Sequence, residues 1–166
     1  MLSRLVRIAA LVALVGLATA TAALGDAGGN GTVTFTQHAD DDVLFSDHLT
    51  NPCTGEPGTL TAIAANEVFH VTYFTNGDEF WVTGTGEGTA TFTPDSPDGV
   101  SASGHFAAWF GESFNNKNDV QHDTNTFHLT GTDGSRLTAH ETTHLSTNAG
   151  GVVTVGFDKL TVSCGP

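Results

Sequence analysis

The pentapeptide His140-Glu141-Thr142-Thr143-His144 has the HExxH spacing of zinc peptidases. On a helix, its two imidazoles lie one turn apart and share a zinc ion, and the glutamate between them activates a water molecule. Four β-branched threonines within residues 135–148 oppose a helix, because each costs roughly 0.5 kcal/mol relative to alanine. We therefore predict a strand, in which His140 and His144 stand roughly 13 Å apart. The enzymatic alternative is a zinc hydrolase with Glu141 as the base and Asp158 as a third ligand.

The segments on either side of Asp133-Gly134 alternate polar and apolar residues, as the two strands of a hairpin do. A three-residue loop with Gly134 in the left-handed conformation would bring the apolar positions of both strands to one side. The other side would then carry four histidines: His122, His128, His140 and His144. We expect His128 near His140 and His122 near His144, because directly opposed side chains lie about 5 Å apart.

His105, with Trp109 on the same side of its strand, borders this histidine cluster. The cluster has three interpretations: a solvent-facing surface, a pocket inside a barrel with Trp81, Trp109 and Tyr73 as walls, or a zinc or copper site that uses His128 and His140. The ligand-binding candidates are His105, Trp109, His122, His128, His140 and His144. No residue is predicted to be catalytic, and no cofactor is predicted apart from that zinc or copper ion.

The elements that must position these side chains are strands, because the chain is rich in threonine and glycine and poor in lysine and methionine. Period-two alternation and turn signals predict strands within residues 32–36, 58–64, 68–74, 80–93, 100–110, 122–130, 136–145 and 152–162. We expect an all-β, antiparallel meander of about seven to nine strands that closes as a barrel, with a β-sandwich as the alternative. Residues 31–166 would form this single domain.

The first 22 residues have the pattern of a secretory signal peptide. Arg4 and Arg7 precede an apolar run at residues 8–17, which ends in small residues at 18–23 and is too short to span a bilayer. We expect cleavage near residue 22, a flexible segment at 23–30, no transmembrane segment in the mature chain and an extracellular location.

Without the signal, three basic residues remain against 18 acidic ones, a net charge of about −15. A surface of this sign repels phosphate backbones and anionic lipid, so nucleic acids and membrane surfaces are not expected partners.

Two cysteines enter an oxidising compartment, and neither has the CxxC spacing of a redox or metal site. We predict a disulfide between Cys53 and Cys164. Closing a loop of roughly 110 residues would stabilise the fold by about 4 to 5 kcal/mol.

The stretch Asn51-Pro52-Cys53-Thr54-Gly55-Glu56 and the closing residues 140–164 resemble those of small secreted β-rich proteins of actinobacteria, whose function is uncharacterised. The resemblance implies the disulfide and the strand at residues 140–145, and it implies no activity. Because the HExxH residues are predicted to lie on a strand, the expected function is a non-enzymatic binding or envelope-associated module, acting as a monomer on a small molecule or an extracellular polymer. Metal binding through the cross-strand histidines and zinc hydrolysis are the alternatives.

Overall fold

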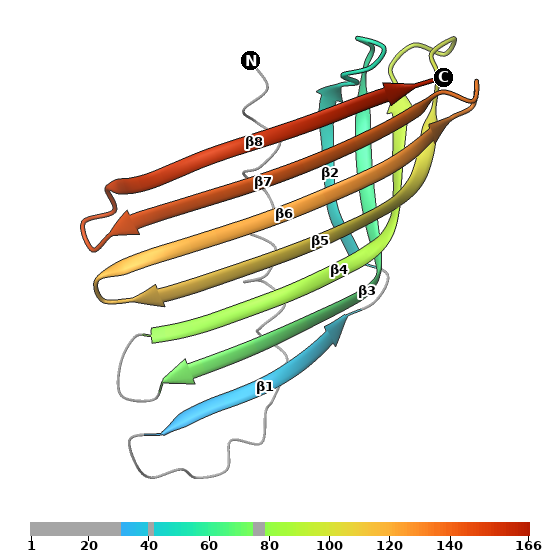
Figure 1. The fold of residues 1–166 in the computed structure, drawn as a ribbon. Coiled ribbons are helices and arrows are strands. Elements are labelled where there is room, and N and C mark those ends of the chain that lie inside the picture. The colour runs from blue at the N-terminus through green and yellow to red at the C-terminus, as the bar shows by residue number, and fades with distance from the viewer. Residues whose placement is uncertain (1–30, 40–41, 75–78) are drawn as a thin grey trace.

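The computed structural model describes residues 31–39, 42–74 and 79–166. The predicted signal peptide (1–22) and the predicted flexible segment (23–30) lie outside these residues. The described part is all-β and consists of antiparallel strands (Figure 1): β1 (Thr32–Ala39), β2 (Asp42–Thr50), β3 (Pro57–Phe74), β4 (Glu79–Pro94), β5 (Ala102–Asn115), β6 (Asn118–Gly131), β7 (Arg136–Asn148) and β8 (Val153–Gly165). No described segment is a helix that could cross a membrane.

The strands form one sheet in the order β1-β3-β4-β5-β6-β7-β8, and β2 also pairs with β3. The 18-residue β3 serves both edge segments, because β2 pairs with its first half and β1 pairs with its second half. From β3 to β8, each strand pairs with the next one in the chain. The sequence patterns predicted all of these strands except β2, and they divided β3 into two.

The predicted barrel is wrong, because the sheet is not closed. A barrel needs a ladder of hydrogen bonds between its two edges, and β8 pairs only with β7 among the described strands. The sheet instead curls, so that β2 lies across from β6, β7 and β8 (Figure 1). The rings of Phe45 on β2 and Phe127 on β6 meet edge-on there, with centroids 6.0 Å apart.

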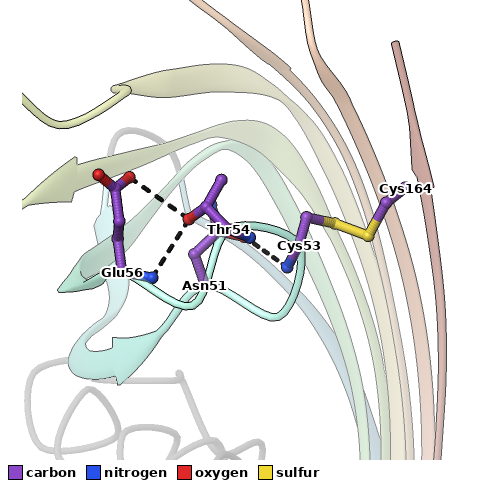
Figure 2. Close-up of a disulfide and its surroundings, with 5 residues drawn as sticks. All are labelled: Asn51, Cys53, Thr54, Glu56 and Cys164. Atoms are coloured by element: carbon purple, nitrogen blue, oxygen red, sulfur yellow. Dashed lines mark hydrogen bonds between the residues drawn. A yellow bond between two sulfur atoms is a disulfide. The ribbon is translucent and has the colours of Figure 1, made fainter.

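A disulfide between Cys53 and Cys164, as predicted, joins the two sides of the curl, with Cα atoms 5.7 Å apart (Figure 2). Cys53 lies in the turn between β2 and β3. The side-chain oxygen of Asn51 accepts hydrogen bonds from the backbone N–H groups of Cys53 (2.9 Å) and Thr54 (3.4 Å), and Gly55 has a positive φ of 77°. This turn fixes Cys53 opposite the end of β8.

The curl depends on a close approach between β3 and β4. The register of this pair shifts at a bulge between Ala64 and Asn66, and bulges bend a strand. Gly88 faces the bulge, and a Cβ atom there would overlap the carbonyl oxygen of Ile63 and lie 2.8 Å from the nitrogen of Ala65. Only glycine fits at this position of β4.

The core lies on the concave side of the sheet, which we call the inner face; the opposite side is the outer face. Alanines on β3, β4 and β5, phenylalanines on β4, β5 and β6, and one leucine on β6 make up this core. The buried cluster consists of Ala62, Ala64, Ala90, Phe92, Ala102, Phe106, Phe127 and Leu129. Because side chains alternate along each strand, these residues fix which positions face inward and which face outward.

The hairpin of β6 and β7 has the predicted loop. Gly131 N–H donates to the carbonyl of Ser135 (2.7 Å), and Gly134 N–H donates to the carbonyl of Gly131 (3.0 Å). The loop therefore has three residues, 132–134, and Gly134 has a φ of 89°. Leu129 lies opposite Leu137, so the apolar positions of both strands share the inner face.

Candidate functional site

The HExxH residues lie in the middle of strand β7, as predicted. His140 is exposed on the outer face, whereas Glu141 faces inward and is only 6% exposed. Alternation along the strand places the carboxylate and the flanking imidazoles on opposite sides of the sheet. The one-turn spacing on which a zinc peptidase depends is absent from residues 136–148.

The predicted ligand-binding candidates all lie on the outer face of β5, β6 and β7. His105, Trp109, His128 and His140 are exposed, and His122 and His144 are half-buried. His122 lies opposite His144, with ring centroids 5.6 Å apart, as expected.

The expected direct opposition of His128 and His140 is wrong. The loop at 132–134 places His128 opposite Thr138 and His140 opposite Thr126. Each imidazole shares a hydrogen bond with that threonine, at 3.2 Å and 2.9 Å. His128 and His140 are therefore diagonal neighbours.

Metal binding by the histidine cluster stays a prediction. In the part of the chain that the structure describes, no three His, Cys, Asp or Glu side chains converge as a metal site would need. His122 and His144 form a pair, and the rings of Trp109 and Phe157 flank it at centroid distances of 5.5 and 5.6 Å.

A cavity of about 100 Å³ lies on the inner face, where β2 faces β6, β7 and β8. Most of its lining is apolar and comes from both sides of the curl. The lining residues are Phe45, Asp47, Leu49, Thr50, Asn51, Pro52, Leu60, Phe92, Asp123, Asn125, Phe127, Leu129, Leu137, Ala139, Glu141, Leu160 and Val162. The predicted walls Trp81 and Trp109 point outward and are exposed, and Tyr73 lies elsewhere on the inner face. None of these three lines the cavity.

Glu141, Asp123 and Asn125 form the polar end of the cavity. Asn125 lies opposite Glu141, and Asp123 lies opposite Thr143, which in turn lies opposite Asp158 of β8. Burial raises the pKa of Glu141 to about 7, and the charges of Asp158 and Asp123 add to the effect. Burial also raises the pKa of Asp123, against the opposing influence of nearby His122. Carboxylates are therefore crowded into a poorly solvated place.

Nothing in the lining balances these carboxylates. The lining contains no lysine, arginine or histidine, and the side chain of Glu141 makes no hydrogen bond within the described residues. Beside it, the buried hydroxyl of Thr143 also has no hydrogen-bond partner in this part of the chain. Buried polar groups are normally paired, and those without a protein partner are commonly satisfied by a ligand or by water.

This polar end was not predicted from the sequence, where the histidines of the outer face formed the candidate site. The signal was present in the same alternation, since the odd-numbered positions that place Phe127 and Leu129 inward also place Asp123 and Asn125 inward. Glu141 follows from the same rule on β7. What the alternation could not provide was β2, which covers these residues and forms the cavity with them.

Comparisons with family models, with curated proteins and with solved structures found no match to this chain.

Proposed function

We propose that this chain is a secreted, non-enzymatic binding protein whose inner cavity takes a compact apolar molecule that carries an ammonium group. The observation that carries the proposal is Glu141, a carboxylate only 6% exposed and without a hydrogen bond among the described residues, at the polar end of an apolar cavity. The side chains on both sides of the curl restrict the size of the ligand and the charge of its head group.

The size of the cavity suits a single ring or a short branched chain. An apolar protein cavity of roughly 150 Å³ encloses benzene. This one, at about 100 Å³, is smaller and partly open to solvent, so a ring can enter it without being fully enclosed. Phe45, Leu60, Phe127 and Leu160 supply apolar contacts to the body of such a ligand. Removing that body from water contributes about 25 cal/mol for each Å² of apolar surface.

The head group follows from the charges. Three carboxylates, those of Asp47, Asp123 and Glu141, reach the lining, and burial raises the pKa of each. A buried charge is costly unless it is paired. An ammonium group brings one positive charge and three donors, which suit Glu141, Asp123 and the side-chain oxygen of Asn125. A carboxylate ligand would add to the repulsion.

Secretion is part of the proposal and rests on two independent features. The residue pattern of positions 1–22 is that of a signal peptide, and Cys53 and Cys164 are joined in a disulfide, which is typical of oxidising compartments. A role as a binder rather than as an enzyme is supported by β7, because this strand places His140 and Glu141 on opposite faces.

The test compares three ligands that share one ring: benzylamine, benzyl alcohol and benzoate. Isothermal titration calorimetry near neutral pH should give benzylamine an affinity at least tenfold higher than the other two, because a charge-assisted hydrogen bond contributes roughly 1.5 to 3 kcal/mol. Glu141→Gln should weaken benzylamine by roughly tenfold and leave benzyl alcohol unchanged.

Glu87→Gln is the matched control, since it makes the same chemical change at an exposed outer-face position and should leave all three affinities unchanged. Leu160→Trp fills the cavity and should abolish binding of both benzylamine and benzyl alcohol. Equal affinities for benzylamine and benzoate, or the same loss in Glu87→Gln as in Glu141→Gln, would overturn the proposal.

A further inference from the structure

The sheet separates ionisable groups by charge type. All eight histidines lie on the outer face: His38, His48, His70, His105, His122, His128, His140 and His144. Arg136 and Lys159 lie there as well. Among strand carboxylates with described side chains, Glu79 and Glu87 face outward, and the others face inward: Asp47, Glu67, Glu112, Asp119, Asp123, Glu141 and Asp158.

The centre of the outer face consists of five histidines on three adjacent strands, which we call the histidine centre: His105, His122, His128, His140 and His144. His105 lies opposite His128, and His122 lies opposite His144. Their other cross-strand neighbours are mainly threonines, whose hydroxyls can accept a hydrogen bond from a protonated ring. Positively charged rings in direct opposition repel each other, and a bound anion relieves this repulsion.

Few fixed charges border these rings. Glu87 is diagonal to His105, Arg136 is diagonal to His128, and Lys159 is diagonal to both His140 and His144. Diagonal neighbours in a sheet lie about 7 to 8 Å apart. Two of these three neighbours are cations, so the charges around the histidine centre also favour binding of an anion.

At the edge of the face, His48 is already paired with Asp95 of the loop after β4, at 2.8 Å. His70 shares a hydrogen bond with Thr36 at 3.0 Å, and His38 lies opposite Val68. These edge histidines belong to β1, β2 and β3 and lie apart from the histidine centre.

We propose that the histidine centre is a second binding site, which takes an anionic polysaccharide at mildly acidic pH and releases it at neutral pH. Histidine is the side chain whose charge changes between about pH 5 and 8. Protonated rings would add positive charge beside Arg136 and Lys159. Without protonated rings, the two cations and two carboxylates of the outer face nearly cancel, and the net charge of about −15 that the chain has without residues 1–22 repels polyanions.

The inward carboxylates oppose this local charge only in part, chiefly at His122, whose charge interacts with Asp123. The side chains of the two faces point in opposite directions from the sheet, so the carboxylates lie farther than the imidazoles from an anion on the outer face. An anion on the outer face therefore interacts mainly with the histidines and much less with Glu141 or Asp123 beneath them.

The shape and chemistry of the face favour a polymer with hydroxyl groups. A convex surface touches a flat membrane over a narrow strip, whereas a flexible chain can follow its curvature (Figure 1). Thr124, Thr126, Thr138 and Thr142 present hydroxyls between the imidazoles, and the exposed ring of Trp109 offers an apolar surface beside His122. Carboxylated sugars match all three chemistries.

The test measures binding of the mature protein to immobilised polygalacturonate at about pH 5 and about pH 7.5, with neutral dextran as the matched polymer. Wild type should bind polygalacturonate at least tenfold more tightly at the lower pH, lose this binding in high salt and ignore dextran at both pH values. The double variant His128→Gln, His140→Gln should bind at least tenfold more weakly at about pH 5.

The decisive variant is His128→Lys with His140→Lys, which keeps the charge at neutral pH and should therefore bind polygalacturonate at about pH 7.5. His38→Gln with His48→Gln removes the same number of histidines at the edge and should change affinity less than about twofold. Binding that does not depend on pH, no binding by the lysine variant at neutral pH, or binding to anionic phosphatidylglycerol vesicles but not to polygalacturonate would overturn the inference.

Discussion

Glu141 and His140 are adjacent in the chain, and they belong to different sites because a strand turns successive side chains to opposite faces. His140 is exposed among threonines and imidazoles, whereas Glu141 is buried beside Asp123 and Asp158. A five-residue motif that would form one catalytic unit on a helix contributes here to two separate surfaces. Substitutions of these two residues should therefore have separate effects.

The pKa of Glu141 makes stability depend on pH. Its folded-state pKa of about 7 lies above the ordinary value of 4.5, so the folded protein holds a proton that the unfolded chain has released between these two values. This contribution is complete below about pH 4.5 and is lost as the pH rises through about 7. The corresponding loss for wild type is roughly 3 kcal/mol.

Glu141→Gln should remove this loss, because glutamine does not ionise. Urea unfolding at about pH 5 and pH 8 should give the variant a free energy of unfolding higher than wild type by roughly 2 to 3 kcal/mol at the upper pH only. Glu87→Gln on the outer face should follow wild type at both pH values. A parallel pH dependence in wild type and Glu141→Gln would show that Glu141 keeps its ordinary pKa in the folded protein.

The individual strands and turns differed in how well they could be predicted from the sequence. The hairpin of β6 and β7 was predictable down to its loop, because Gly134 allows one left-handed residue and the apolar positions demand an odd loop length. β2 was not predicted, because Leu44 lies in a register shift between Val43 and Phe45 and breaks the alternation. A prediction of the polar end of the cavity would have needed both the register of β6 and β7 and the presence of β2.

The bend between β3 and β4 should be sensitive to one methyl group. In Gly88→Ala, the added Cβ meets the backbone of Ile63 and Ala65, which cannot move away without breaking the ladder. Gly86→Ala is the matched variant two residues away on the same face, where the nearest atom, Cγ of Glu67, is 3.5 Å from the added Cβ.

We expect Gly88→Ala to lose roughly 2 kcal/mol or more of unfolding free energy, and Gly86→Ala to be neutral or slightly stabilised. Chemical denaturation of both variants at one pH measures the difference. Equal stabilities would mean that the close approach at the bulge does not determine the bend.

At the scale of the whole molecule, the disulfide holds the curl where a barrel would have hydrogen bonds. β8 is an edge strand that pairs only with β7 in the described part of the chain, and several of its residues, including Val153, Val155 and Phe157, are at least half exposed. Cys164 ties the end of this strand to the turn after β2, next to Asn51 and Pro52 of the cavity lining.

Cys53→Ser with Cys164→Ser should therefore lower both stability and ligand affinity. The bond closes a separation of 111 residues, and a loop of about this length is worth roughly 4 to 5 kcal/mol, or a fall in Tm of more than about 10 °C. Thermal unfolding measures the first effect, and the benzylamine titration measures the second. Hydrogen exchange should show lost protection in β8 and retained protection in β3 and β4, and uniform loss would contradict this picture of the edge.

The same bond has a topological consequence. Cys53 and Cys164 make a covalent ring that contains β3 to β7, β8 as far as Cys164, and the chain segments between these strands. Exposed turns are the places where proteases cut, but a single cut at Asp133-Gly134 or at Asn148 opens the ring without releasing a fragment. The cut chain keeps both ends attached, and its hydrogen-bonded ladders hold them in place. An antiparallel sheet that lacks the closure of a barrel thus remains one molecule after a first proteolytic cut.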